Sequence, residues 1–123
     1  MKGTFDFGGY TIVNCTPHPI RFLGHDGQVV EVPPSGYTLL AKPNEVYADD
    51  GFSLFSLVRT VFVPSPEGKA ELAEIEQRGL LPVGSIISAQ AWPGRVVSLV
   101  PVEGYERKPP MEKLYRCDKF NTF

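Results

Sequence analysis

The chain has 123 residues, 42% of them hydrophobic and 21% charged, and its formal net charge is −2. This length and apolar content correspond to one domain with a single core. A slightly acidic chain offers no generally basic surface, so sequence-specific nucleic-acid binding is not expected, although a local basic patch stays open. No window approaches the roughly 18 apolar residues that span a bilayer, so no membrane contact is expected.

The N-terminus and the cysteines indicate the compartment. Residues 1–7 lack the apolar segment of a secretory signal, which predicts a protein of the cell interior. Cys15 and Cys117 lie near opposite ends of the chain, and in that compartment they are expected to be reduced thiols. A disulfide that ties the first strand to the last stays open as the alternative.

The first half reads as short strands and turns. Residues 1–9 alternate Phe5 and Phe7 with polar neighbours, so they either pair at a sheet edge or are mobile. Asp26-Gly27 is a hairpin turn signal and predicts a β-hairpin over Ile20–Val32. Strand-forming runs occur at Tyr10–Asn14, Ile20–Leu23, Gln28–Val32 and Tyr37–Ala41.

The second half contains the one clear helix. Ser65 can cap it, Pro66 suits its first position, and it should span about Pro66–Arg78, before Gly79. Lys42–Gly51 is a polar, turn-rich stretch with a turn signal at Asp49-Asp50-Gly51, and the ambiguous stretch Phe52–Val63 is read as a strand at Val58–Val63 with room for a helical turn before it. Strands are also predicted at Ser85–Ala91 and at Val96–Val102, the latter central. Leu114–Phe120 is predicted as a strand or a turn of helix.

Together these elements predict an α+β fold. We expect a single domain over residues 1–123, built on a mostly antiparallel, strongly bent sheet or a small β-barrel. One helix, at about 66–78, should pack on the sheet, because a helix this short is not stable alone. Residues 1–9 and 103–113 are candidates for flexibility.

The segment Asn14-Cys15-Thr16-Pro17-His18-Pro19 concentrates the most potential chemistry. Two prolines stiffen the backbone around His18, and a fixed imidazole suits ligand binding or acid–base work. Asn14 and Thr16 could orient it or contact a ligand. The alternative is structural, because Asn and Thr before Pro commonly form side-chain turns that end a strand.

Two further groups could take part in a ligand site. Ser85, Ser88 and Gln90 would share one face of a strand that ends in Trp92 and Arg95, where an indole can stack and a guanidinium can bind phosphate. Basic and aromatic residues alternate between Tyr105 and Lys119 and include Arg116. The alternatives are an ordinary solvated sheet face and a solvated tail.

Enzymatic chemistry has less support. Cys15, His18, His25 and Cys117 could ligate a metal, but they lack the paired spacing of zinc ligands. Cys15 with His18 could form a nucleophilic pair, although such pairs usually come from separate elements. Phosphate-binding glycine loops are absent from the sequence. We therefore expect no catalytic residue, metal or cofactor, and a protein that is more readily a non-enzyme.

Three motifs together resemble small phage and prophage proteins that have no assigned activity. The motifs are the box Asn14–Pro19, the turn Pro33-Pro34-Ser35-Gly36, and Gly84–Ala91, which is similar to a Gly-x-Ile-x-Ile-Ser-x-x-x-Ala strand in that group. The chain departs from the group in having Lys42 in place of an arginine after the Ser-Gly turn. It also has Trp92-Pro93-Gly94-Arg95 where the group tends to have Arg-x-Asp. The resemblance implies a mobile-element origin.

The leading functional hypothesis is a phage-encoded, non-enzymatic protein that binds a small anionic, nucleotide-like ligand and so sequesters a host defence signal. The alternatives are a virion accessory or an inhibitor of a host enzyme, and, third, a hydrolase that uses Cys and His or a metal. We expect the host cytoplasm, or the virion for an accessory protein, and a homo-oligomer is an open option. The ligand site would consist of Asn14, Thr16, His18, Ser88, Gln90, Trp92, Arg95 and Arg116.

Overall fold

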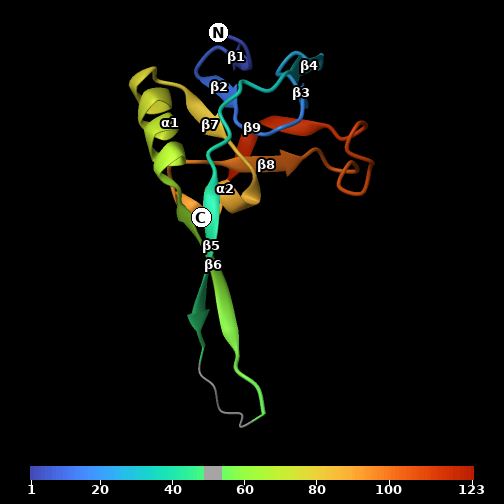
Figure 1. The fold of residues 1–123 in the computed structure, drawn as a ribbon. Coiled ribbons are helices and arrows are strands. Elements are labelled where there is room, and N and C mark those ends of the chain that lie inside the picture. Colours follow the sequence, from blue (N-terminus) through green and yellow to red (C-terminus); the bar gives the residue numbers. More distant parts are fainter. Residues whose placement is uncertain (49–53) are drawn as a thin grey trace.

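The computed structural model describes residues 1–48 and 54–123 and shows a body from which a two-stranded arm extends (Figure 1). The body has a three-stranded sheet in the order β1-β2-β7, a four-stranded sheet in the order β4-β3-β9-β8, and two helices. The elements of the body are β1 (Thr4–Asp6), β2 (Thr11–Asn14), β3 (Ile20–Leu23), β4 (Val29–Val32), α1 (Pro66–Gln77), β7 (Leu81–Val83), α2 (Ile86–Ala91), β8 (Ser98–Pro101) and β9 (Tyr115–Asn121).

The two sheets of the body are joined by one parallel bridge between Val83 and Val97. The strand predicted at Val96–Val102 is present as β8, which pairs antiparallel with β9. Its predicted central position is wrong, because β8 ends the four-stranded sheet and only the bridge at Val97 joins this segment to β7. Two strand pairs are parallel, β2 with β7 and β3 with β9, and the others are antiparallel. The α+β prediction is confirmed, and the described strands do not close into a barrel.

The core consists of two clusters that lie on opposite faces of β2. Neighbouring side chains of a strand point to opposite faces, and accordingly Ile12 belongs to one cluster and Val13 to the other. The Val13 cluster packs against α1 and α2 through Leu72, Ile75 and Trp92. Both faces of β2 are thus buried, and β2 is the central strand of its sheet.

The hairpin and the first helix are confirmed. β3 and β4 pair antiparallel, and Gly27 N donates to Gly24 O at 3.0 Å in the turn between them. In α1, Ser65 is the N-cap and its Oγ accepts from Gly68 N at 3.0 Å, while Pro66 takes the first turn. These predictions succeed because turn and cap signals act over a few neighbouring residues.

Two alternatives were open for each terminal segment, and both segments form strands. Residues 1–9 were expected to pair at a sheet edge or to be mobile, and Leu114–Phe120 to be a strand or a turn of helix. β1 pairs antiparallel with β2 at the edge of its sheet. β9 is a strand that carries Cys117 between β3 and β8.

The prediction of a strand over Ser85–Ala91 is wrong, because this segment forms helix α2. Ser85 is its N-cap and accepts from Ser88 N at 3.1 Å. Ser88 and Ala89 are buried while Gln90 is exposed, so the alternating polar face does not exist. Burial of the small residues Ser88, Ala89 and Ala91 against the body outweighs the strand propensity of Ile86 and Ile87.

The arm consists of β5 (Ala41–Tyr47) and β6 (Val58–Pro64), which form a separate two-stranded antiparallel sheet. The strand predicted at Val58–Val63 is confirmed. The strand predicted at Tyr37–Ala41 and the turn-rich stretch from Lys42 are wrong, because the strand begins only at Ala41 and continues to Tyr47. The predicted turn at Asp49–Gly51 and the beginning of the Phe52–Val63 stretch lie outside the described residues, and residues 54–57 form no helical turn.

Candidate functional site

Asn14 is a structural residue at the centre of the body. Its side chain is 0% exposed. Its Nδ2 donates to His18 O at 2.8 Å and to Val32 O at 3.1 Å, and its Oδ1 accepts from Thr16 N and Thr16 Oγ1. All hydrogen-bonding positions of the amide are used, so Asn14 holds the end of β2 to β4 and has nothing left for a ligand.

Two of the three motifs in the sequence contact each other. Ser35 N and Ser35 Oγ donate to Asn14 O at 3.0 and 2.6 Å, and Asn14 N donates to Gly3 O at 2.8 Å. Gly3 has φ +79°, and a Cβ there would lie 2.4 Å from Ser35 Cα. The Asn-x-Thr-Pro-His box and the Pro-Pro-Ser-Gly turn thus form one interlocked junction, which agrees with the structural alternative.

His18 is exposed, and its carbonyl accepts from Asn14 Nδ2 and Thr16 Oγ1 within this junction. It lines a cavity of about 290 Å³ with Arg21, Glu31 and Met111, among others. Neither Arg95 nor Arg116 lines this cavity. His18 is therefore not joined to the basic residues with which the ligand hypothesis combined it.

The predicted Trp–Arg group is dispersed by the helical form of residues 86–91. Trp92 is 4% exposed and packs in the core, and Ser88 Oγ donates to Leu39 O at 2.8 Å. Arg95 pairs with Glu76 through two hydrogen bonds of 2.6 and 3.1 Å, which lower the pKa of Glu76 and raise that of Arg95. An indole in the core cannot stack on a ligand.

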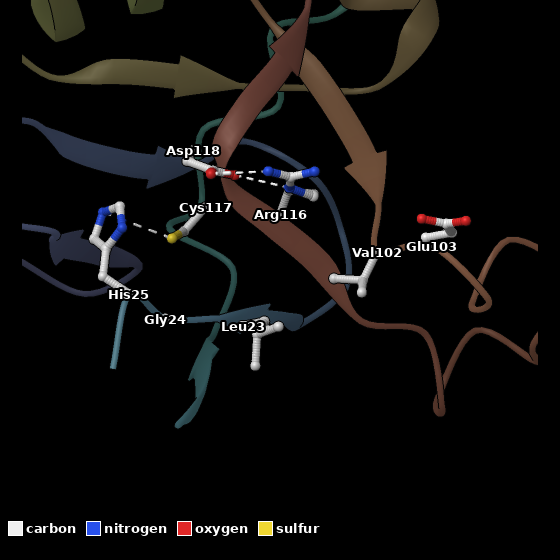
Figure 2. A pocket seen from close by; sticks show the side chains of 8 residues that line it. All are labelled: Leu23, Gly24, His25, Val102, Glu103, Arg116, Cys117 and Asp118. Atoms are coloured by element: carbon white, nitrogen blue, oxygen red, sulfur yellow. Dashed lines mark hydrogen bonds and ion pairs between the residues drawn. The ribbon is translucent and has the colours of Figure 1, made fainter. Parts of the chain in front are cut away.

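Arg116 lines a different cavity, of about 330 Å³, beside the turn after β3 (Figure 2). Its guanidinium pairs with Asp118 through bonds of 2.8 and 2.9 Å, and this pairing lowers the pKa of Asp118. His25 Nε2 lies 3.8 Å from Cys117 Sγ on the other side of Asp118. The cavity also contains the carboxylates of Glu103 and Asp118. The positive charge of Arg116 is therefore already neutralised by its ion pair with Asp118.

Both thiols are in the expected free state, and the disulfide left open as the alternative is not formed. Cys15 and Cys117 are free and buried in separate clusters. Burial raises the pKa of Cys15 to about 12, and burial followed by the charge of Asp118 raises the pKa of Cys117. A thiol with a raised pKa is a poor nucleophile at neutral pH. Within residues 1–48 and 54–123, no group of three or more His, Cys, Asp or Glu could hold a metal ion.

The eight residues proposed as one ligand site are therefore not gathered. Thr16, His18 and Arg116 line three different cavities. What the sequence did not reveal is the arm, because the polar β5 resembles a loop. A signal was present in Val58–Val63, since an exposed β run needs a partner strand and the polar stretch before it is the nearest candidate.

The arm exposes an unusual amount of apolar surface. Tyr47 is 78% and Leu54 92% exposed. The other exposed large apolar residues of its strands and adjoining segments are Leu40, Val46, Phe55, Leu57, Val58 and Val63. An isolated two-stranded hairpin is only marginally stable in water, so this surface calls for a partner.

The hydrogen-bonding pattern between β5 and β6 shows which backbone N–H and C=O groups of the arm point away from the partner strand. Ala48 N donates to Leu57 O and Ser65 N to Leu40 O, at the two ends of the arm. Hydrogen-bonded and non-hydrogen-bonded pairs alternate in an antiparallel ladder, and this register makes Glu45–Thr60 and Pro43–Phe62 non-hydrogen-bonded pairs. Backbone groups of Val58, Thr60 and Phe62 therefore point to the outer edge of β6, and no hydrogen bond described for them lies outside the ladder.

The two edges of the arm differ in their capacity to pair. On the outer edge of β5, Pro43 has no N–H where the ladder would present a donor. Glu45 adds a charge to the same edge. The edge of β6 has no proline before Pro64, and Arg59 is its one charged residue. Proline and charge are the usual devices that prevent edge pairing. Among the positions whose backbone groups point outward, β5 carries Pro43 and Glu45, whereas Val58, Thr60 and Phe62 on β6 are neither proline nor charged.

Comparison with protein-family models, with curated proteins and with solved structures finds no match to this chain. None of the helices in the described parts of the chain is long and apolar enough to cross a membrane.

Proposed function

We propose that this protein functions through protein–protein association, and that the outer edge of β6 is the contact element. The observation that carries the proposal is the exposed β5–β6 arm, whose β6 edge has outward-pointing backbone groups at the exposed residues Val58 and Thr60. Phe62, nearer the body, packs against the core. This is the interaction alternative to ligand sequestration, and it fits a structural or accessory protein of a phage. Addition of a strand to an open edge supplies main-chain hydrogen bonds, and side chains on both faces of the sheet add burial.

The partner that fits this edge is a second copy of the chain. An antiparallel pair of identical strands is self-complementary under two-fold symmetry. Two β6 edges would convert two marginal hairpins into one four-stranded sheet in the order β5-β6-β6-β5. Arg59 limits the register, because like charges directly opposite each other are unfavourable. Registers centred on Val58 or Thr60 keep Arg59 away from its own copy.

Paired proline substitutions test this proposal. Thr60→Pro removes an outward N–H from the β6 edge, and Glu45→Pro removes the outward N–H of its ladder partner on the β5 edge. The same change is thus made on opposite edges of one rung. Sedimentation velocity over a wide range of protein concentrations should show a dimer for the unsubstituted chain and for Glu45→Pro, and a monomer for Thr60→Pro.

Two results would count against the proposal. A chain that stays monomeric at all concentrations has no self-association, and the β6 edge would then have to serve another protein. Equal dimerisation by Thr60→Pro and Glu45→Pro would place the contact elsewhere. Circular dichroism of each variant establishes that the body remains folded.

A further inference from the structure

A cavity of about 390 Å³ lies between the strands β8 and β9 and the start of α2. It is formed by residues from segments far apart in the sequence. Its polar lining includes Lys113, Tyr115, Ser98 and Asn121, and its apolar lining includes Ile86 and Leu99. A volume of this size falls in the lower part of the range for small-molecule sites, about 300–1,000 Å³.

The charge of this cavity is one-sided. Among the described residues that line it, Lys113 is the one charged side chain, and none of them is a carboxylate. The ion pairs found in the described parts of the chain are Glu74–Arg78, Glu76–Arg95 and Arg116–Asp118, which leaves Lys113 uncompensated. What distinguishes Lys113 from the exposed Lys119 is that it is partly buried in the wall of a cavity.

Ser98 provides a second, independent observation. Its residue is 1% exposed, and its Oγ has no hydrogen-bond partner within the described residues. A buried hydroxyl without a partner is costly, and such a group calls for a bound molecule that satisfies it. Asn121 Nδ2 uses one contact, to Leu99 O at 3.3 Å, and an amide nitrogen carries two hydrogens.

We propose that this cavity binds a small organic anion with a single carboxylate or phosphate group and an attached apolar group. Lys113 would pair with the anionic oxygens, and hydroxyl and amide donors of Ser98, Tyr115 and Asn121 would complete their hydrogen bonds. The exposed side chain of Ile86 would contact the apolar part. The site shares Thr16 with the eight-residue set expected from the sequence, and it does not depend on self-association through the arm.

Amide chemical-shift titrations with benzoate and with phenyl phosphate test the proposal, and benzamide serves as the neutral counterpart of benzoate. At least one anion should give saturable shifts centred on β8 and β9, and benzamide should bind at least tenfold more weakly than benzoate. Lys113→Met should weaken binding at least tenfold. Lys119→Met is the matched control, because Lys119 is an exposed lysine of β9 that does not line the cavity.

Ser98→Ala separates a ligand contact from a structural role. It removes the orphan hydroxyl, so the anion-free protein should be at least as stable as the unsubstituted chain, while anion affinity falls. Binding by neither anion, equal binding of benzamide and benzoate, or unchanged binding by Lys113→Met would overturn the proposal. The titrations can be repeated on Thr60→Pro, so that failure of the cavity proposal is distinguished from failure of the arm proposal.

Discussion

Asn14 shows how a residue that looks chemical can be structural. Its buried amide makes four hydrogen bonds that hold β2, β4 and the His18 loop together. A buried polar group of this kind contributes to the stability of the fold because it satisfies the hydrogen bonds of its buried partners, and its own burial contributes less.

Replacement of Asn14 by alanine should therefore destabilise the protein. The change leaves the buried carbonyl of Val32 without this donor, and we expect the free energy of unfolding to fall by about 2–3 kcal/mol. Urea unfolding measures this quantity. Gln28→Ala is the control, because it removes an amide from an exposed turn residue and should change stability by less than about 0.5 kcal/mol. Similar values for both variants would contradict the structural role of Asn14.

Cys15 gives the protein a predictable response to alkaline pH. Burial raises the pKa of its thiol from 9.0 to about 12 in the folded state. The unfolded thiol therefore ionises first, and the stability from the protonated thiol is complete below pH 9 and lost as the pH rises toward 12. One such group contributes a slope of up to about 1.4 kcal/mol per pH unit.

The measurement compares the unsubstituted chain with Cys15→Ala. The difference in the free energy of unfolding between the two proteins should shrink from about pH 8 to about pH 10, because only one of them carries the thiol. A difference that stays constant over this range would show that the thiol ionises equally in both states. Taking the difference cancels the titration of tyrosine and lysine side chains that both proteins share.

At the level of elements, the packing of α1 against the end of α2 determines whether alanine can replace Gly68 of α1 without loss of stability. Glycine is less favourable than alanine in a helix interior by about 1 kcal/mol. At Gly68, however, an added Cβ would lie 2.5 Å from Trp92 Cη2 and 2.8 Å from Leu40 O. Close packing against the body therefore opposes the intrinsic preference.

We expect Gly68→Ala to destabilise the protein by about 1–3 kcal/mol, the usual cost of overpacking. Thermal or urea unfolding measures the change. Trp92→Phe removes the clashing atom, so the double variant Gly68→Ala with Trp92→Phe should be more stable than the sum of the two single effects predicts. Strict additivity, or stabilisation by Gly68→Ala alone, would show that the two helices do not pack in this way.

For the whole molecule, the arm links stability to concentration. If two chains pair through β6, dissociation by dilution exposes the apolar arm again, and mass action then favours unfolding at low concentration. The midpoint of thermal unfolding should therefore fall on dilution for the unsubstituted chain and for Glu45→Pro. The midpoint should be independent of concentration for Thr60→Pro. Differential scanning calorimetry at several protein concentrations measures it. A midpoint that moves equally in all three proteins would contradict pairing through β6.

The sequence by itself determined the features that depend on near neighbours. The β3–β4 hairpin follows from Asp26-Gly27, and α1 follows from Ser65-Pro66. The α+β class follows from many short strands and one capped helix. Each signal acts within a few residues, so no knowledge of the rest of the chain was needed.

Only the tertiary structure decided which residues share a surface. Residues 86–91 form a helix because their small side chains are buried, and β5 is a strand because β6 pairs with it. Trp92 belongs to the core, and Arg95 pairs with Glu76 from another element. Lys113 forms no ion pair within residues 1–48 and 54–123. Burial and pairing between distant segments are settled by the whole fold, and local sequence carries little information about them.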